Sequence, residues 1–418
     1  MTKIFCGLDF GTSNSTVSVV EDHRPWLIPL EGNHLTIPSA LFFSFEEDKT
    51  YFGRHAIADY VEGAEGRLMR ALKSVLGTPL MEETTQVKNR SLSFLEILGT
   101  FIGHLKNKTE ANIGAPLTQA VFGRPVHFVD GNPTADAKAQ NQLETVARAQ
   151  GFKTIDFQFE PISAALTYEQ QVTEEKLALI VDIGGGTSDF SIVRVSPERA
   201  KAADRKNDIL ANAGVHLGGT DFDKQLSMAK VMPQLGYQTP NINGKQVLPA
   251  SYYFDLATWQ RINNLYKKNM APELRRLHQS AKYPHLIERL IALVEDRQGH
   301  TLAGKVEDVK MGLTHTDTSH INLGFLKPPL DIDITKQEFE AAINEATHRI
   351  AATAQQTLTM ASLTPQSIQA VFLTGGSTQI PLIKQTILSL FPSADIIQGD
   401  MFGSVGLGLA LDAKRKFS

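Results

Sequence analysis

Two segments about 173 residues apart share one pattern, and this repeat constrains the fold more than any other feature of the chain. The first covers residues 4–20, IFCGLDFGTSNSTVSVV, and the second covers residues 177–193, LALIVDIGGGTSDFSIV. In each, an apolar run ends in an aspartate, and a glycine turn, a Thr-Ser pair and a second apolar run follow. A repeat of this length is far too long for a solenoid. It predicts a duplicated domain in which two hairpins with glycine corners face each other across one ligand.

The paired corners have the chemistry of a polyphosphate site. Glycine lacks Cβ, so the backbone can adopt φ > 0 and approach a ligand closely. Successive N–H groups then converge on an anion, and Thr or Ser hydroxyls add donors. An aspartate at the end of a strand suits Mg²⁺, which keeps several waters and takes one or two carboxylates. A plain β-turn explains either corner alone equally well, whereas the pair favours phosphate binding. The matched positions are Asp9 with Asp182, Gly11 with residues 184–186, Thr12 with Thr187, and Ser13 with Ser188.

Length and composition narrow the class of protein. A chain of 418 residues is too long for one compact core and predicts two or more lobes. The net charge of −4 gives no argument for binding nucleic acid or an anionic membrane. The first predicted strand begins almost at the N-terminus, and no apolar stretch is long enough to span a bilayer, so we expect neither a signal peptide nor a membrane anchor. The single cysteine, Cys6, excludes an intrachain disulfide and reads as a small core residue. These features predict a cytoplasmic protein.

Hydrophobic spacing gives a coarse map of the elements between the repeats. Residues 51–112 have a helical pattern, in which Leu68, Leu72 and Val75 share one face. A glycine turn then leads to a helix over residues 222–229, for which Asp221 is the expected N-cap. Residues 230–330 are polar, with predicted helices at 256–266, 284–295 and 304–313 and a closing strand at 319–323. This segment is interpreted as a mobile insertion in the second copy, and a separate partner-binding domain is the alternative.

Five motifs in order resemble the actin/Hsp70/sugar-kinase superfamily, and specifically the Hsp70 (DnaK-type) ATPase domain. They are LDFGTSNS, VDIGGGTSDFSI, FEPISAAL, VHLGGTDFD and LTGGSTQIPLIK. The resemblance implies an α/β, actin-like (ribonuclease H-like) duplicated fold with two lobes around a central nucleotide cleft. Lobe I is then expected at residues 1–172 plus about 395–418, with an inserted subdomain at about 39–116. Lobe II is expected at residues 173–394, with an inserted mobile subdomain at about 225–334.

The resemblance also implies roles for residues that hold the phosphates and the metal. Asp9 and Asp182 are expected to hold Mg²⁺ through water. The expected catalytic residues are Lys73, Glu160, Asp182, Thr187 and Asp189. The expected cofactor-binding residues on this side are Gly11, Thr12, Ser13, Asn14, Gly184, Gly185, Gly186, Thr187, Gly218 and Gly219, of which Thr12, Ser13, Gly185, Gly186 and Thr187 would cradle the phosphates.

Three residues to which the resemblance assigns a role, Lys73, Glu160 and Pro125, also have structural explanations. Lys73, in RALKSVLG, resembles the family lysine that reaches the γ-phosphate, and a surface lysine on an amphipathic helix is the alternative. Glu160 resembles the carboxylate that orients water and metal, although an acid at a helix N-terminus is also favoured by the helix dipole. Pro125 resembles a conformational-switch proline, and a turn proline explains it equally well.

The resemblance also implies two sets of residues that would enclose the ribose and adenine of the nucleotide from opposite sides. VEDVKMGLT would bring Glu307, Lys310 and Thr314 to the ribose and adenine. The opposite wall is expected from Gly375, Gly376, Ser377 and Gln379. Gln379 stands where the family usually has an arginine that stacks on adenine, and an amide is a poorer stacking plane.

The implied activity is slow hydrolysis of ATP in a chaperone-like nucleotide switch, with ATP/ADP and Mg²⁺ as ligands. Family chaperones continue into a linker and a peptide-binding domain, so a chain ending in LGLALDAKRKFS resembles the truncated bacterial Hsp70 homologues. The expected partners are nucleotide and a protein partner or exchange factor, with no nucleic acid and no membrane, and a monomer is expected. A small-molecule kinase of the same superfamily and an actin-like scaffold are the alternatives.

Overall fold

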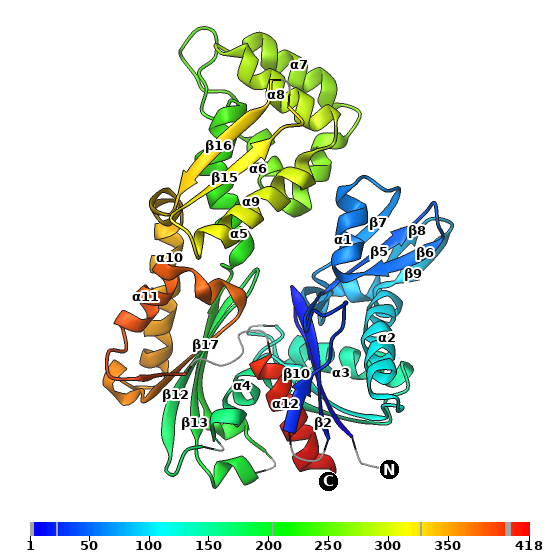
Figure 1. Ribbon diagram of the computed structural model, residues 1–418, viewed down its shortest axis with the longest axis vertical. Coiled ribbons are helices and arrows are strands. Elements are labelled where there is room, and N and C mark those ends of the chain that lie inside the picture. Colours follow the sequence, from blue (N-terminus) through cyan, green and yellow to red (C-terminus); the bar gives the residue numbers. More distant parts are fainter. Residues whose placement is uncertain are drawn as a thin grey trace.

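The computed structural model describes residues 4–21, 24–129, 131–169, 171–202, 204–326, 328–397 and 403–418. Its two largest sheets lie in the lower half of Figure 1, and their main strands follow the same order. Each is built on an antiparallel hairpin, with a further antiparallel strand on one side and two parallel strands on the other. This equivalence confirms the duplication that the two repeated segments predict.

The first sheet contains the first repeated segment as a hairpin. Within that hairpin, Asp9 pairs with Thr16, and the next pair, Phe10 with Ser15, is the last before the glycine corner. The apolar side chains of the hairpin are buried, in keeping with strands covered on both faces. The strands are β1 (Phe5–Phe10), β2 (Asn14–Glu21), β3 (Arg24–Leu27), β4 (Ile37–Pro38), β10 (Gln119–Arg124) and β11 (Thr154–Phe159).

The second sheet contains the second repeated segment in the equivalent position. Asp182 lies directly opposite Asp189 across the hairpin, and it also pairs with Thr374 on the neighbouring parallel strand. The strands are β12 (Lys176–Ile183), β13 (Ser188–Val195), β14 (Ile209–Val215), β17 (Ala370–Thr374) and β18 (Asp395–Ile397).

Helices α4 (Glu160–Glu169) and α12 (Ser404–Phe417) lie between the two sheets (Figure 1). Buried side chains from both helices and both sheets form one apolar cluster there, which includes Ile162, Ile180 and Leu409. The helices cross closely, because a Cβ at Gly408 would lie only 1.9 Å from the carbonyl oxygen of Ser163. The sheets are therefore joined through a packed helix pair, and α4 starts at Glu160, beside the glycine corners.

An inserted segment separates the hairpin of the first sheet from its parallel strands. The predicted helical run over residues 51–112 was wrong in its middle, because Leu68 lies on a strand that pairs with Phe42. Non-local strand pairing there outweighs a spacing that by chance resembles a helical face. The elements are β5 (Ala40–Ser44), β6 (Lys49–Phe52), α1 (Gly53–Val61), β7 (Gly66–Arg70), the 3₁₀ turns η1 (Leu72–Val75) and η2 (Pro79–Glu82), β8 (Thr84–Val87), β9 (Arg90–Ser93) and α2 (Phe94–Ile113). Helix α3 (Pro133–Ala149) connects β10 to β11.

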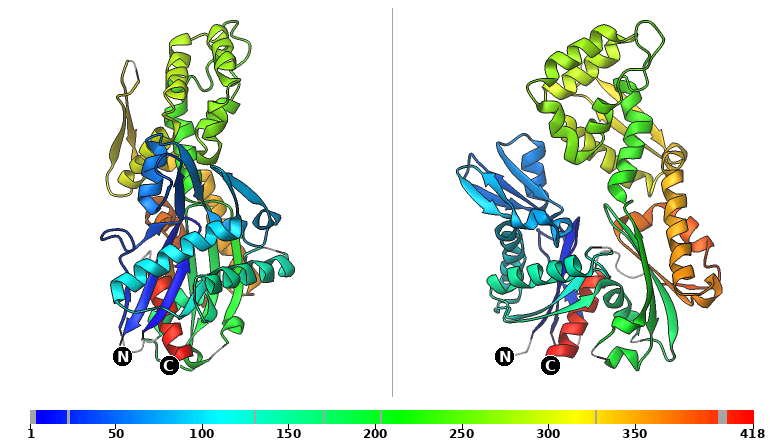
Figure 2. Two further views of the ribbon diagram at one scale, coloured as in Figure 1. Left: turned by 90° about the vertical axis from the view of Figure 1, so that its right-hand side faces the viewer. Right: turned by 180° about the vertical axis from the view of Figure 1, so that it is seen from behind.

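A larger inserted segment follows the second hairpin, and its helices extend beyond the sheets at one end of the molecule (Figure 2). The elements are α5 (Gly219–Leu226), the π turn η5 (Ser227–Val231), η6 (Met232–Leu235), α6 (Ser251–Leu256), η7 (Trp259–Tyr266), α7 (Met270–Ser280), α8 (Pro284–Glu295), α9 (Gly299–Leu313), β15 (Thr318–Leu323) and β16 (Leu330–Thr335).

Two helix predictions for this segment were wrong in detail. The helix expected at 222–229 starts at Gly219, so Asp221 lies in its first turn and accepts the Gly218 N–H at 3.0 Å. The helix expected at 256–266 is instead a 3₁₀ helix that starts at Trp259, after α6 has ended. The strand expected at 319–323 is confirmed as β15, which pairs antiparallel with β16.

The remaining elements complete the second half. Thr335 caps the long helix α10 by accepting the Glu338 N–H, while the Glu338 carboxylate accepts the Thr335 N–H. Among the helices in the described ranges, none has the length and hydropathy that a bilayer-spanning segment requires. The elements are η3 (Arg199–Lys201), η4 (Lys206–Asp208), α10 (Lys336–Met360), η8 (Pro365–Ser367), η9 (Gly376–Gln379) and α11 (Pro381–Ser389).

Candidate functional site

The two glycine corners come from different sheets and touch each other. A Cβ built on Gly185, in the second corner, would lie 2.3 Å from the Ser13 hydroxyl oxygen in the first. No side chain fits at Gly185 while Ser13 stays in place. The structure thus brings together two residues, one from each repeat, that the sequence assigns to the same phosphates.

Ser39 supports the first corner and was not among the predicted site residues. Its hydroxyl donates to the Gly11 carbonyl at 2.6 Å, and its N–H donates to the Ser13 carbonyl at 2.8 Å. Both carbonyls are thereby engaged on the Ser39 side, while Thr12 and Asn14 are exposed. The only sequence signal for this role is the Ile-Pro-Ser-Ala stretch around residue 39, which is not distinctive.

A second glycine turn clamps the second corner. Gly219 donates its N–H to the Gly184 carbonyl at 3.0 Å, and Thr220 donates both its N–H and its hydroxyl to the Gly185 carbonyl, at 2.8 and 2.7 Å. A Cβ at Gly218 would lie 2.5 Å from the backbone nitrogen of Gly186. Only glycine fits in this contact, because backbone meets backbone there.

Charged side chains gather next to the corners. The Lys73 Nζ lies 2.5 Å from the Glu160 Oε1, and the two side chains are only 10% and 16% exposed. A Cβ at Gly123, at the end of β10, would lie 3.5 Å from the Asp9 Oδ1 and 3.4 Å from the Glu160 Cγ. Lys73 is thus not the surface lysine of the alternative interpretation. Gly123 is a neighbour of the site that was not among the predicted residues.

Burial and like charge perturb the carboxylates of this cluster. Burial, together with the nearby Glu160, raises the pKa of Asp9 to about 7. Burial, with Asp189 and Glu160 nearby, raises the pKa of Asp182 to about 7. Burial alone would lower the pKa of Lys73, but Glu160, Asp9 and Asp182 together raise it above its ordinary value. The cluster has more carboxylates than cations, so a bound cation would stabilise its ionised form.

The carboxylates of Asp9 and Asp182 fit a hydrated divalent cation by charge and by donor type. Among the described residues, no three His, Cys, Asp or Glu side chains are grouped as a direct metal site. Mg²⁺ commonly keeps most of its waters and takes few protein ligands, so holding through water suits the two aspartates.

On the nucleoside side, Lys310 lies beside the glycine turn of the second corner. Its ammonium lies 2.8 Å from an Asp223 carboxylate oxygen and donates to the Gly219 carbonyl at 3.3 Å. Burial raises the pKa of Asp223 to about 6, against the lowering effect of Lys310. Asp223 was not predicted as a site residue, although it belongs to the VHLGGTDFD motif that carried part of the resemblance.

The remaining predicted nucleoside residues lie on or next to two elements, helix α9 and the 3₁₀ turn η9. Thr314 ends α9 and donates its hydroxyl to the Lys310 carbonyl at 3.2 Å, while Glu307 is exposed on that helix. Gly375 has φ +80°, and a Cβ there would lie 2.7 Å from the Asp182 Oδ1. The Ser377 hydroxyl donates to the Gly184 carbonyl at 3.2 Å, whereas Gly376 is exposed and Gln379 is half-buried.

Pro125 occupies a turn that its own neighbour stabilises. The Arg124 guanidinium donates to the carbonyls of Pro125 and Val126 at 3.1 and 3.2 Å, and it pairs with Asp136 at 2.8 Å. Asp136 in turn accepts the Phe128 N–H. This geometry supports the turn interpretation of Pro125, and the switch role stays a prediction.

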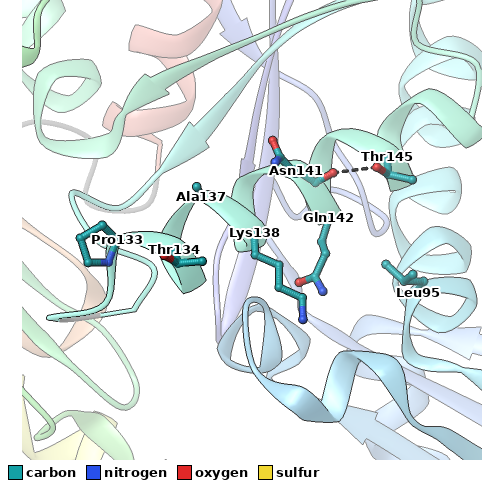
Figure 3. Close-up of a pocket in the computed structure, with 8 residues that line it drawn as sticks. All are labelled: Leu95, Pro133, Thr134, Ala137, Lys138, Asn141, Gln142 and Thr145. Atoms are coloured by element: carbon teal, nitrogen blue, oxygen red, sulfur yellow. Dashed lines mark hydrogen bonds between the residues drawn. The ribbon is translucent and has the colours of Figure 1, made fainter.

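A surface depression of about 670 Å³ lies elsewhere, along α3 and next to Leu95 of α2 (Figure 3). Its lining includes Lys138, Asn141 and Gln142 but none of the residues of the glycine corners. The depression is therefore separate from the candidate nucleotide site.

The duplicated sheets and the meeting of two glycine corners over buried carboxylates define the class of actin-like ATPase folds. The chain belongs to the Hsp70 family, because the family model described as Hsp70 protein matches residues 5–232 and 288–413. The match covers most of the chain and confirms the resemblance drawn from the five motifs. Members of the family are ATPases that bind ATP or ADP with Mg²⁺. The matched ranges leave out residues 233–287, within the larger inserted segment.

Proposed function

We propose that this protein binds Mg–ATP between its two glycine corners, hydrolyses it slowly, and works as a chaperone-like nucleotide switch. The observation that carries the proposal is the contact between Ser13 and Gly185, which unites the two repeats beside Asp9 and Asp182. A site made from both copies accounts for the duplication, whereas two separate β-turns would not need to meet.

In this proposal the corners bind the phosphates and the charged cluster acts on the terminal one. Backbone N–H groups and the hydroxyls of Thr12, Ser13 and Thr187 hold the phosphate oxygens. Mg²⁺, held through water by Asp9 and Asp182, would supply charge neutralisation. Lys73 offsets charge that develops on the γ-phosphoryl group, and Glu160 or Asp189 orders the attacking water. Phosphoryl transfer needs little covalent work from the protein, so positioning and electrostatics account for the rate.

The same proposal assigns the nucleoside to the side of the second corner where Gly219 and Lys310 meet. Lys310 and Thr314 of α9 would reach the ribose, with Glu307 at the rim. The Gly375–Gly376 turn and Gln379 would form the other wall. Gln379 offers amide hydrogen bonds where an arginine would stack, so we expect weaker preference for adenine than in relatives with that arginine.

The switch itself would be a change in the angle between two lobes, residues 1–172 plus about 395–418 and residues 173–394. The two halves meet through the packed pair α4 and α12, and Glu160 begins α4. A nucleotide held by both corners would favour the closed arrangement, and hydrolysis with release would favour opening. A protein partner or exchange factor would then read or drive this change.

Phosphate release from purified protein, wild type beside Asp182→Ala and Lys73→Ala, tests the proposal. We expect slow Mg-dependent release from wild type and loss of at least about 100-fold in both variants, with nucleotide binding better retained in Lys73→Ala. Wild-type turnover in Lys73→Ala would remove its assigned role. A sharp rise in turnover on adding one metabolite would indicate a kinase, and nucleotide-dependent sedimentation would indicate a scaffold.

A further inference from the structure

The two inserted segments touch each other away from the glycine corners, on facing sides of the upper part of Figure 1. The guanidinium of Arg70, the last residue of β7, lies over the ring of Trp259 at 4.7 Å from the ring centroid. Trp259 is the first residue of η7, in the segment inserted after the second hairpin. This distance is that of a cation–π contact.

A second pair of contacts supports the same junction. The Tyr60 hydroxyl of α1 accepts a hydrogen bond from the Asn263 side chain at 2.7 Å. The Tyr60 ring packs edge-on against His300 at 4.8 Å, and the Trp259 ring packs edge-on against the same imidazole at 4.7 Å. Arg70 and Tyr60 therefore meet one small aromatic surface made by η7 and α9.

Charge reinforces the position of Arg70. Desolvation lowers the pKa of the Arg70 guanidinium, and Glu307 of α9 acts in the opposite direction. The residue nevertheless keeps an exposed surface. The charge of Glu307 thus acts on Arg70 from the helix that carries the proposed ribose residues.

The turn that follows Arg70 leads directly to the proposed catalytic lysine. Ala71 has φ +55° and ψ +35°, a left-handed conformation that alanine adopts only where the surroundings impose it. Two residues later, Lys73 forms its short contact with Glu160. The turn is therefore held at one end by Arg70 on Trp259 and at the other by Lys73 on Glu160.

The η7 side of this junction lies in the part of the chain that the family match leaves out. Trp259 and Asn263 fall within residues 233–287, whereas Arg70 and Lys73 fall within the matched range 5–232. A segment outside the family match thus contacts the turn that carries the family-like lysine.

We propose that Arg70 is a positioning residue, whose contact with Trp259 joins the two inserted segments and orders the Ala71 turn so that Lys73 lies beside Glu160. This inference rests on the proposed function for its catalytic consequence. Hydrolysis then requires the inserted segment of the second half to be docked, because an undocked Trp259 releases one end of the turn. A partner that lifts that segment would stop hydrolysis without entering the nucleotide site.

The kinetic test compares Arg70→Ala, Trp259→Leu and the double variant with wild type, using single-turnover phosphate release and nucleotide affinity. Each single variant should lower the rate of phosphate release about 5- to 20-fold, while affinity for ADP stays within about threefold of wild type. The double variant should lower the rate no further than either single variant, because both substitutions remove the same contact. Arg70→Lys, which keeps a cation, should fall in between. Arg67→Ala, on the same strand with its side chain exposed, is the matched control and should keep the wild-type rate. Full activity in Arg70→Ala, or additive losses in the double variant, would overturn the proposal.

Hydrogen exchange of the nucleotide-free protein separates this proposal from the proposed function. Arg70→Ala and Trp259→Leu should each raise the exchange rate of residues 71–76 at least about fivefold, and Arg67→Ala should not.

Tryptophan fluorescence gives a second measurement of the same contact. In a Trp26→Phe background Trp259 is the sole tryptophan, so its fluorescence should change in Arg70→Ala. If wild type releases no phosphate, the proposed function fails while these measurements still decide the positioning claim. Unchanged hydrogen exchange in Arg70→Ala would refute the positioning role of Arg70.

Discussion

The two glycine corners have nearly the same sequence but are supported in different ways. The first is supported by one residue, Ser39, whose hydroxyl donates to the Gly11 carbonyl and whose N–H donates to the Ser13 carbonyl. The second is supported by backbone from a distant turn, where Gly218 lies against Gly186, and by the Ser377 hydroxyl. Duplication therefore kept the ligand-facing pattern, while each copy acquired its own support. The comparison predicts that the second corner tolerates substitution less well than the first.

The largest effect is expected for Gly218→Ala. The added Cβ would lie 2.5 Å from the Gly186 nitrogen and 2.6 Å from the Gly185 carbonyl carbon, and backbone atoms cannot rotate away. We expect a loss of about 2–4 kcal/mol in the free energy of unfolding and loss of nucleotide binding. Denaturant unfolding without nucleotide measures the first, and calorimetry the second.

Gly186→Ala is the matched control for stability, because a Cβ at Gly186 meets nothing within 4 Å. Its free energy of unfolding should stay within about 0.5 kcal/mol of wild type. Equal stabilities for the two variants would show that the second corner is not clamped by the Gly218 turn.

A smaller effect is expected for Ser39→Ala in the first corner. The variant loses the hydroxyl bonds to the Gly11 carbonyl and to Ser15 but keeps the backbone bond to Ser13, so a cost of about 1–2 kcal/mol is expected. If the lost bonds loosen the first corner, the affinity of the protein for ATP should drop about 5- to 20-fold. Ser15→Ala, which removes only the bond between the Ser15 and Ser39 hydroxyls, is the control and should retain wild-type affinity. A Ser39→Ala variant that binds like wild type would mean that the first corner holds its shape unaided.

The smallest effect is a dependence of stability on pH that both corners share. Asp9 and Asp182 have pKa values near 7 in the folded protein and ordinary values near 3.8. Between these values the folded state binds more protons than the unfolded chain, so stability falls as pH rises through this window. The nucleotide-free and metal-free protein should thus melt about 1–3 °C lower at pH 7.5 than at pH 5.5 from this source.

Asn substitution identifies the carboxylates responsible for that slope. Asp182→Asn should flatten it, whereas Glu46→Gln, at an exposed position, should leave it unchanged. An unaltered slope in Asp182→Asn would place the titrating group elsewhere.

The parts of the structure that local pattern encodes were predictable. The glycine–aspartate repeat predicted both hairpins and their duplication, and the five motifs led to the Hsp70 family. Strand β7 was missed, because the spacing of Leu68, Leu72 and Val75 resembles a helical face and the pairing of Leu68 with Phe42 is non-local.

The supporting residues of the site were not predictable for a related reason. Ser39 and Gly123 act through contacts with segments far away in the sequence, and neither belongs to one of the five motifs. Trp259 reaches Arg70 only because the two inserted segments lie face to face. Glu160 and Lys73 were predictable as single residues, but their contact at 2.5 Å required the fold.

The central claim is that two corners hold one nucleotide, and a calorimetric titration of the wild-type protein with ATP tests it most directly. With Mg²⁺ we expect one ATP per chain, and without Mg²⁺ we expect affinity to fall at least about 10-fold, because the Asp9–Asp182 pair then faces the phosphates uncompensated. No binding, or binding that is indifferent to Mg²⁺, would contradict the account.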